Sequence, residues 1–194
     1  MSHAKRVSPL ILASRSPQRR AILEQLGIPF EVRPADTEER TAGPAEEVVT
    51  QNALDKARAA ARATADGRLV LGVDTVVVLD GLVYGKARGH DEAREYLTCL
   101  SGRSHEVWSA IALVQEEAER VAATCTTVTF RKLGDRILDW YLASGEWRER
   151  AGAYAIQGKG AALVRRIEGD YWNVVGLPIA LLIDNAPQIL DARD

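Results

Sequence analysis

The sequence predicts an α/β fold with a mixed sheet, and two features of its pattern lead to that prediction. Short apolar runs alternate with helical segments in the first half of the chain, as in sheets whose parallel strands are joined by helices. Runs joined directly by turns dominate the middle, as in antiparallel hairpins. The chain has 194 residues, of which 46% are hydrophobic and 27% charged, so we expect residues 1–194 to form a single domain.

The first half of the chain alternates predicted strands with predicted helices. We expect Ser16 to cap the first helix, because Ser side chains accept backbone N–H bonds and Pro17 suits the first turn. Gly27 ends that helix. The second helix is rich in Ala at helical spacing. In order, the expected elements are a strand at Leu10–Leu12, a helix at 17–26, a strand at Phe30–Val32, a helix at 44–64 and a buried strand at 69–79.

The second half is predicted to contain hairpins and shorter helices. Asp80 and Gly81 form a two-residue turn, and the polar stretch 115–120 separates two long strands. Gly residues on both sides of Lys159 indicate a loop, and Pro187 leaves the end of the last helix open. The expected elements are strands at Leu82–Tyr84, 105–114, 121–130 and 161–167, and helices at 91–100, Asp135–Ala143 and 177–190.

The charge balance disfavours a nucleic-acid partner. The chain has 25 Lys and Arg against 27 Asp and Glu, a net charge of −2, so no overall positive field would hold a polyanion. A local basic pocket for a small anion is compatible with this balance. Cys99 and Cys125 are not in a CxxC pair and not near a His, so the sequence does not indicate a zinc site.

No targeting or membrane segment is expected. Residues 1–9 carry charge but no apolar run, so they do not resemble a signal peptide. The longest apolar stretches, 69–79 and 177–183, are far shorter than the ~20 residues of a membrane span. We therefore expect a cytoplasmic protein without membrane contact.

The first candidate site is the start of the first predicted helix. A strand that runs into a helix N-terminus offers free N–H groups and a favourable dipole to an anion. Arg19 and Arg20 lie in that first turn, where cations oppose the dipole, and a bound anion would resolve the conflict. The alternative is that both arginines point into solvent, and this segment alone supports the two readings about equally.

The second candidate is Asp74, inside the apolar strand 69–79. A carboxylate there must be paired, metal-bound or at an opening. Gly72 permits close approach of backbone or ligand. Asp74 could hold a hard cation such as Mg²⁺, or deprotonate a water for attack on phosphorus. The alternative is a strand-end Asp bonded to a neighbouring turn, and the apolar surroundings favour function.

The remaining candidates are persuasive only as a set. Lys56 lies mid-helix, Lys86 follows a hairpin and Glu39 lies in an acidic loop, so each alone is more simply a solvated surface residue. Gln157, beside Gly158, offers the donor and acceptor that base recognition needs, although a plain glycine turn is common. The chain has no P-loop, GxGxxG, HExxH or GxSxG motif.

Together these segments resemble the Maf family, named for septum-formation inhibition and understood as nucleoside triphosphate pyrophosphatases. The likeness runs from about Leu10 to Leu182. One such motif would be weak, but their occurrence in family order is specific. They are Leu12-Ala13-Ser14-Arg15-Ser16-Pro17, Glu39, Lys56, Gly72-Val73-Asp74-Thr75-Val76-Val77, Gly85-Lys86, Leu100-Ser101-Gly102 with His105 and Val107, Tyr154-Ala155-Ile156-Gln157-Gly158, and Asn173-Val174-Val175-Gly176-Leu177-Pro178.

The resemblance implies a mixed, strongly twisted sheet with flanking helices and two lobes around a cleft, akin to inosine triphosphate pyrophosphatases. It implies a divalent metal cation, such as Mg²⁺ or Mn²⁺, and a homodimer. Asp74 matches the proton acceptor, with metal contact as its second role, and Glu39 matches the acidic position near the metal. The matched phosphate-binding positions are Ser14, Arg19, Lys56 and Lys86.

The last two motifs resemble the branch that acts on dTTP and UTP, in which the positions of Thr75 and Gln157 are linked to base choice. Gln18 stands where typical members carry Arg, at a position tied to substrate choice. We expect hydrolysis of a nucleoside triphosphate, foremost dTTP or UTP, to the monophosphate and pyrophosphate. The alternatives are the same reaction on modified or noncanonical nucleotides, and a nucleotide-binding regulator of cell division or septum formation.

Overall fold

Seven strands form one mixed sheet in the computed structural model, which describes residues 8–64 and 66–191. The strand order is β2-β1-β3-β5-β6-β7, with β4 paired to β3 outside this path. The pairs β1–β2 and β1–β3 are parallel, and all the other pairs are antiparallel. The predicted fold class is therefore confirmed. The stretch 1–9, predicted to lack an apolar run, lies largely outside the described residues.

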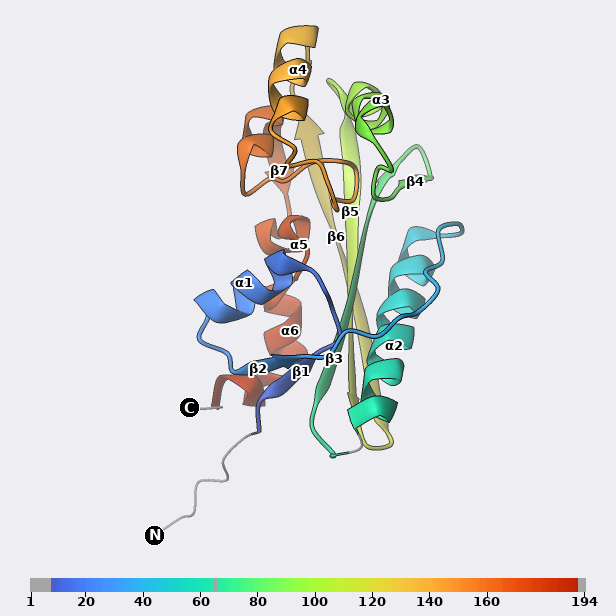
Figure 1. Ribbon diagram of the computed structural model, residues 1–194, viewed down its shortest axis with the longest axis vertical. Helices are drawn as coiled ribbons and strands as arrows, with labels where there is room; N and C mark the ends of the chain where they lie inside the picture. Colours follow the sequence, from blue (N-terminus) through green and yellow to red (C-terminus); the bar gives the residue numbers. More distant parts are fainter. Residues whose placement is uncertain (1–7, 65, 192–194) are drawn as a thin grey trace.

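The strands differ greatly in length, and the long ones connect the two ends of the molecule. Figure 1 shows β3, β5 and β6 side by side along much of its height. The short strands pair with only part of them. The bounds are β1 Leu10–Leu12, β2 Phe30–Val32, β3 Val70–Leu79, β4 Leu82–Tyr84, β5 Ser104–Gln115, β6 Ala118–Phe130 and β7 Val164–Glu168.

The helices cover both faces of the sheet at one end and cap it at the other. In Figure 1, α2 lies on one face of the lower half, α1 and α6 lie on the other, and α3 and α4 lie at the upper end. The bounds are α1 Pro17–Gln25, α2 Ala45–Thr64, α3 His90–Leu100, α4 Asp135–Ala143, α5 Tyr171–Val175 and α6 Ile179–Asn185, with 3₁₀ turns η1 Lys159–Leu163 and η2 Pro187–Asp191. No helix in the described ranges is long and apolar enough to span a membrane.

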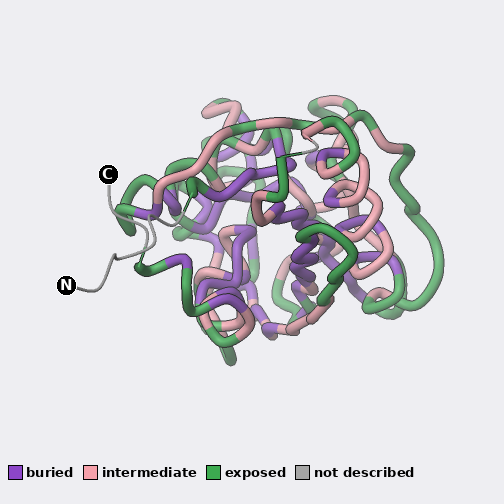
Figure 2. Tube along the Cα trace, turned by 90° about the horizontal axis from the view of Figure 1, so that it is seen from below, coloured by how far each residue is buried: buried purple, intermediate pink, exposed green. Residues whose placement is uncertain are grey.

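Apolar side chains form a separate cluster under each group of helices. Alternation along β3 sends Val70 and Val76 toward α2, and Leu71 and Val73 toward α1 and α6. A third cluster fills the upper end beneath α3 and α4. Figure 2 shows these buried stretches in the interior, with exposed loops around them. The two predicted lobes correspond to the two lower clusters and the upper one.

Helix α2 lies unusually close to β3 because Gly72 has no side chain. A Cβ at Gly72 would overlap the carbonyl of Ala53 and come within 2.8 Å of the Ala57 nitrogen. The close approach expected at Gly72 is therefore made by the backbone of a helix. It places the polar residues of α2 directly beside Asp74, which follows two positions later on the same side of β3.

Three predicted segments differ from the structure by more than a residue at one or both ends. The long hairpin turns through Glu116 and Glu117 rather than 115–120, because polar side chains do not prevent backbone pairing up to Gln115 and Ala118. The strand predicted at 161–167 begins as a 3₁₀ turn, and strand geometry starts only at Val164. The predicted helix 177–190 is α6 followed by η2, since Pro187 cannot continue the α6 hydrogen bonds.

Two further local details were not as predicted. Ser16 precedes α1 but makes no side-chain cap bond; its hydroxyl donates to Gln18 Oε1 at 3.0 Å. Helix α5 was not predicted. Asp170 caps it by accepting the Trp172 N–H at 2.8 Å, and Gly176, with φ of 116°, ends it.

Candidate functional site

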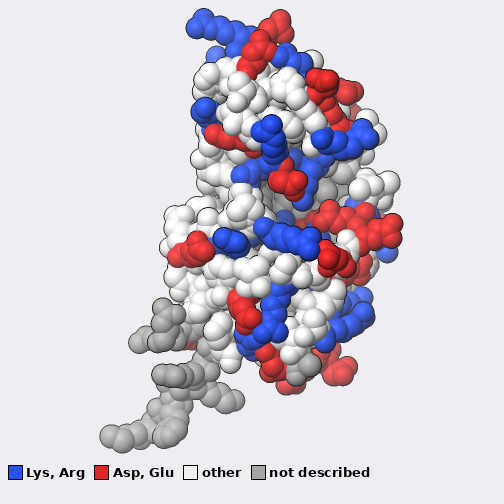
Figure 3. All heavy atoms as spheres, viewed as in Figure 1, with Lys and Arg blue, Asp and Glu red and all other residues white. Residues whose placement is uncertain are grey.

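A cleft of about 860 Å³ lies between the two lobes. Figure 3 shows Lys and Arg side chains around the hollow on this face, interleaved with Asp and Glu. Every site residue predicted from the sequence lines this cleft, although the residues are spread over much of the chain. They are Ser14, Gln18, Arg19, Glu39, Lys56, Asp74, Thr75, Lys86 and Gln157.

The lower wall of the cleft is formed where the parallel strands β1 and β2 end and β3 continues beyond them. Ser14 follows the end of β1, and Glu39 lies in the loop that follows β2. Asp74 lies in the middle of β3, on the side that faces α2. Parallel strands bring the segments after their carboxyl ends to the same edge of the sheet. Topology therefore explains why residues distant in sequence share one wall.

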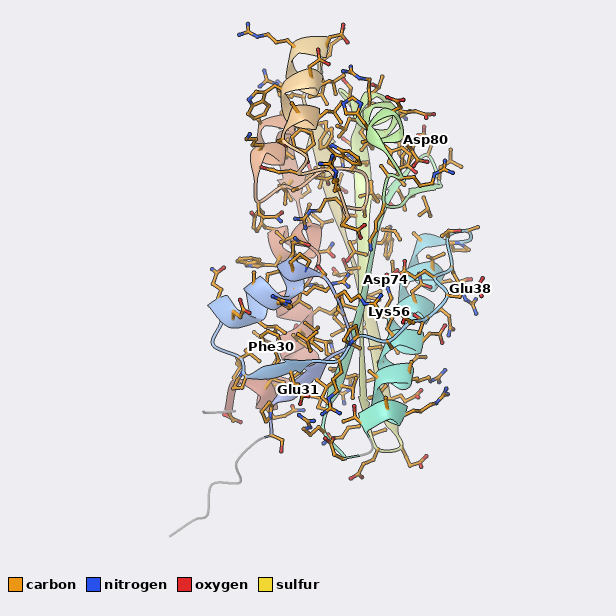
Figure 4. All side chains as sticks on the ribbon, in the orientation of Figure 1. Phe30, Glu31, Glu38, Lys56, Asp74 and Asp80 are labelled. Atoms are coloured by element: carbon orange, nitrogen blue, oxygen red, sulfur yellow. The ribbon has the colours of Figure 1, made fainter. Side chains whose placement is uncertain are left out.

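Asp74, Lys56 and Glu39 form the centre of that wall. Lys56 Nζ lies 2.6 Å from Asp74 Oδ1 and 2.6 Å from Glu39 Oε1. Figure 4 shows Lys56 and Asp74 facing each other between α2 and β3. Asp74 is only 6% exposed, so this pairing satisfies the requirement that a carboxylate in an apolar strand have a partner. The alternative of an Asp bonded to a neighbouring turn is wrong, because Asp74 bonds to side chains of helix α2.

Asn52 completes the surroundings of Asp74 and was missed from the sequence. Its Nδ2 donates to Asp74 Oδ2 at 2.9 Å and to the Arg40 carbonyl at 3.0 Å, and its Oδ1 accepts the Arg40 N–H at 2.8 Å. Two bonds to one backbone unit fix the amide orientation, so the remaining N–H is aimed at Asp74. The signal was its position four residues before Lys56, on the same face of α2.

Arg19 does not point into solvent, and its guanidinium bonds to protein acceptors on several elements. Its Nε donates to the Gly176 carbonyl at 2.9 Å, and its Nη1 donates to the Val73 carbonyl at 2.9 Å and to Ser14 Oγ at 3.0 Å. Its Nη2 donates to Thr75 Oγ1 at 3.2 Å. Carbonyls and hydroxyls thus resolve the conflict that a bound anion was expected to resolve.

The two arginines of the first turn differ in environment. Arg20 is exposed, in agreement with the solvent alternative, whereas Arg19 is half-buried at the cleft. Burial lowers the pKa of Arg19, while the charges of Asp74 and Glu39 raise it. A guanidinium remains charged under such conditions.

The predicted specificity residues occupy different parts of the cleft. Thr75 Oγ1 lies 2.8 Å from the buried Ser109 Oγ, on the strand beside it. Gln18 lies at the start of α1, where it accepts a bond from Ser16. Gln157 is exposed at the upper lobe. A nucleotide in contact with all of them would span both lobes.

Glu39 is held as a carboxylate by its neighbours. Burial raises its pKa, but the hydrogen bond and charge of Lys56, together with the charges of Lys86 and Arg19, outweigh burial and leave the pKa below its ordinary value of 4.5. An ionised Glu39 provides oxygen donors of the kind that hard cations prefer.

The cleft fits a cation that is shared with a ligand. Glu39 and Asp74 each direct one oxygen to Lys56 Nζ, so two carboxylates converge on one point. No cluster of three or more His, Cys, Asp or Glu suited to a metal occurs in residues 8–64 and 66–191. Mg²⁺ commonly takes one or two carboxylates and completes its shell with water and phosphate oxygens, which this pair permits.

The family model described as "Maf-like protein" matches residues 9–188 of the chain. A protein of Anaeromyxobacter dehalogenans named "dTTP/UTP pyrophosphatase" is 48% identical over 177 residues, which cover 88% of this chain and 89% of that protein. A protein of Gloeobacter violaceus with the same name is 49% identical over 177 residues, covering 90% of this chain and 93% of that one. The solved Staphylococcus aureus Ham1 protein overlaps 63% of this chain and 72% of its own, at 16% identity and a TM-score of 0.46.

Proposed function

Because the chain belongs to the Maf family, we propose that it is a nucleoside triphosphate pyrophosphatase whose foremost substrates are dTTP and UTP. The observation that carries the proposal is the meeting of Asp74, Lys56 and Glu39 at one point of the cleft between the lobes. A buried carboxylate beside a lysine and a second carboxylate suits phosphoryl chemistry, and the named relatives supply the substrate pair.

The proposed reaction breaks the anhydride bond between the α- and β-phosphates. The oxygen of water forms a new bond to the α-phosphorus, and pyrophosphate leaves with the electron pair of the broken bond. Asp74 accepts the proton of the water. Each oxygen of Asp74 receives one hydrogen bond, from Lys56 or from Asn52, so each retains lone pairs for that role. The positive charge of Lys56 stabilises negative charge that develops on the phosphates.

The proposal includes a divalent cation, Mg²⁺ or Mn²⁺. Glu39 and Asp74 would hold it, and when bound it would neutralise phosphate charge and polarise phosphoryl oxygens. Asp74 then has two assigned roles, with proton acceptance first and metal contact second. Lys56 and the fixed amide of Asn52 keep its carboxylate in place for both.

We also propose an oligomeric state, a cellular location and a class of partner. The family resemblance supports a homodimer and a cytoplasmic location, and the net charge of −2 supports a small nucleotide rather than a nucleic acid as the partner. Light scattering on the purified protein tests the dimer: a mass near 42 kDa is expected from a 21.2 kDa chain, and a mass near 21 kDa contradicts it.

Pyrophosphate release from a panel of triphosphates tests the activity. Purified protein with Mg²⁺ or Mn²⁺ is offered dTTP, UTP, CTP, ATP, GTP, ITP and modified nucleotides. We expect monophosphate and pyrophosphate, with the highest kcat/KM for dTTP or UTP. Preference for another nucleotide would keep the reaction and replace the substrate. No release from any of them would favour the nucleotide-binding regulator.

A further inference from the structure

The turn after α4 follows an unusual backbone path at the upper rim of the cleft. Glu149, Gly152 and Ala153 all have left-handed φ angles, of 58°, 64° and 58°. Such angles are uncommon for residues with a side chain, and they persist where the surrounding structure enforces them. Here the Gly152 N–H donates to the Tyr84 carbonyl at 2.9 Å, which ties the turn to β4.

This path brings the charged side chains of Lys86, Glu149 and Arg150 to one rim of the cleft. Lys86 forms an isolated antiparallel bridge with Ala151, so the residues on either side of Ala151 lie beside Lys86. Lys86 Nζ lies 3.0 Å from Glu149 Oε2, and these side chains are 57% and 78% exposed. An exposed pair of this kind is weak, so an incoming phosphate can replace Glu149 at little cost.

Arg150 lines the same cleft, and no residue in 8–64 or 66–191 accepts a hydrogen bond from its side chain. Its Nε is buried and has no hydrogen-bond partner, and its guanidinium forms no ion pair with any residue in the described ranges. The charge of Glu146 acts on it, but Glu146 Oε2 accepts the Lys159 N–H at 2.7 Å. Burial of a charged donor that has no acceptor is unfavourable, so its retention indicates that a ligand supplies one.

Most other cations of the cleft already have partners: Arg15 pairs with Asp36, and Arg88 pairs with Glu92. Lys56 lies between two carboxylates, and Arg19 donates to carbonyls and hydroxyls. Arg40 lacks an ion pair among the described residues but is exposed, so water solvates it. Arg150 is half-buried, and its buried Nε lacks an acceptor among the described residues; its fork of N–H groups matches phosphate oxygens.

We propose that Arg150 and Lys86 form a second phosphate-binding pair on the upper rim, which holds the pyrophosphate portion of the substrate. Glu149 forms an ion pair with Lys86 when no nucleotide is bound. The inference deepens the proposed function and rests on it. The reacting phosphate would then lie at Asp74 on the lower wall, and the leaving group at Arg150 and Lys86.

Binding of inorganic pyrophosphate, measured by titration calorimetry with Mg²⁺, tests the pair. Arg150→Gln removes the fork, and we expect an affinity at least about tenfold weaker, since hydrogen bonds to charged groups contribute ~1.5–3 kcal/mol. Arg148→Gln is the matched control, because Arg148 is exposed in the same turn and lies over the Trp147 ring at 4.7 Å. Its affinity should equal that of the wild type. Arg150→Lys, which keeps the charge without the fork, should be intermediate.

Thermal unfolding separates binding from a structural role. If Arg150 serves a ligand, Arg150→Gln should unfold at the same temperature as the wild type or higher without pyrophosphate, and should lose the stabilisation that pyrophosphate provides. Glu149→Gln should bind pyrophosphate a few-fold more tightly, because the competing carboxylate is gone. Wild-type affinity in Arg150→Gln, or a lower unfolding temperature without ligand, would overturn the pair.

Failure of the proposed function gives a different pattern. A wild-type protein that releases no pyrophosphate from any triphosphate but binds it through Arg150 would overturn the hydrolytic activity and leave the binding pair in place. Active wild-type protein whose KM and pyrophosphate affinity are both unchanged by Arg150→Gln would overturn the pair alone. A wild-type protein that does not bind pyrophosphate at all would also overturn the pair.

Discussion

Asp74 is the residue on which the proposed chemistry depends most directly. It is buried in β3, yet both its oxygens face polar donors at the cleft. Asp74→Asn keeps the shape and removes the proton acceptor. We expect kcat to fall by roughly 10²–10⁴ while nucleotide still binds, the usual loss for an acid–base group. Steady-state kinetics and nucleotide titration measure the two effects, and an unchanged kcat would remove Asp74 from the mechanism.

Asn52 should act on the reaction through Asp74. In Asn52→Asp a second carboxylate faces Asp74 in place of an N–H donor, and two adjacent carboxylates resist being ionised together. We expect the acid limb of the kcat–pH profile to move to higher pH. Gln51→Glu makes the same charge change one position away, where Gln51 bonds Asp55, and should leave the limb in place. Identical limbs in the two variants would show that Asn52 serves structure alone.

His105 should make stability depend on pH. Burial lowers its pKa from 6.5 to about 4. Its Nδ1 has no hydrogen-bond partner in the described part of the chain, and its Nε2 lies 3.0 Å from Tyr154 Oη. As pH falls, His105 of the unfolded chain is protonated before His105 of the folded protein. The contribution of neutral His105 to the free energy of unfolding is therefore complete above pH 6.5 and is lost as pH falls toward 4, by up to roughly 3 kcal/mol.

Denaturant unfolding at pH 7 and at pH 4 checks this prediction. His105→Gln cannot titrate and should lose less stability between the two pH values than the wild type. The exposed His90 provides the control, and His90→Gln should follow the wild type. Parallel losses in all three proteins would rule out His105 as the source.

At the scale of elements, the contact of α2 with β3 sets the geometry of the site. Gly72→Ala would force a methyl group against the Ala53 carbonyl and the Ala57 nitrogen, so α2 must move away from β3. We expect a loss of stability of about 1–3 kcal/mol, the usual cost of overpacking, and a lower kcat because Lys56 and Asn52 move with the helix. Gly85→Ala, where a Cβ meets open space, should leave the free energy of unfolding unchanged.

Elements with a strong local pattern were predicted well from the sequence. The strands at Leu10–Leu12, Phe30–Val32 and Leu82–Tyr84 and the helix at Asp135–Ala143 have the predicted bounds. The errors occur where tertiary contacts or short turns decide. Helix α5 has five residues, too few for a readable period, and η1 is a 3₁₀ turn inside an apolar stretch.

The site was predicted unevenly, for a related reason. Asp74 was visible because a carboxylate in an apolar strand is a local conflict, and the resemblance placed its partners. Asn52 and Arg150 gave no such conflict, because polar residues in a helix and a turn are ordinary. Their importance depends on their contacts in the fold: Asn52 bonds to the Arg40 backbone, whereas the buried Nε of Arg150 has no acceptor among the described residues. Only the folded chain contains that information.

At the scale of the whole molecule, the cleft separates two groups of charges carried by different clusters of core residues. The lower wall carries Asp74, Lys56 and Glu39 above the clusters under α1, α2 and α6, and the upper rim carries Lys86 over the cluster under α3 and α4. The long strands β3, β5 and β6 join both ends. A triphosphate that spans the cleft would therefore connect the two lobes, and its binding should be visible in global stability.

The metal and the nucleotide should bind together rather than independently. Lys56 already pairs with both carboxylates that would hold a cation and offsets part of their charge, so Mg²⁺ alone gains little, whereas phosphate oxygens add ligands and negative charge. We expect Mg²⁺ alone to leave the unfolding temperature of the wild type unchanged, and Mg²⁺ with a dTTP analogue whose α–β bridging oxygen is replaced by a non-hydrolysable group to raise it. At 100 times the dissociation constant the gain is about 2.7 kcal/mol. The non-hydrolysable analogue prevents turnover while both carboxylates stay in place. A rise with Mg²⁺ alone, equal to that with both ligands, would instead indicate a metal site that is complete within the protein.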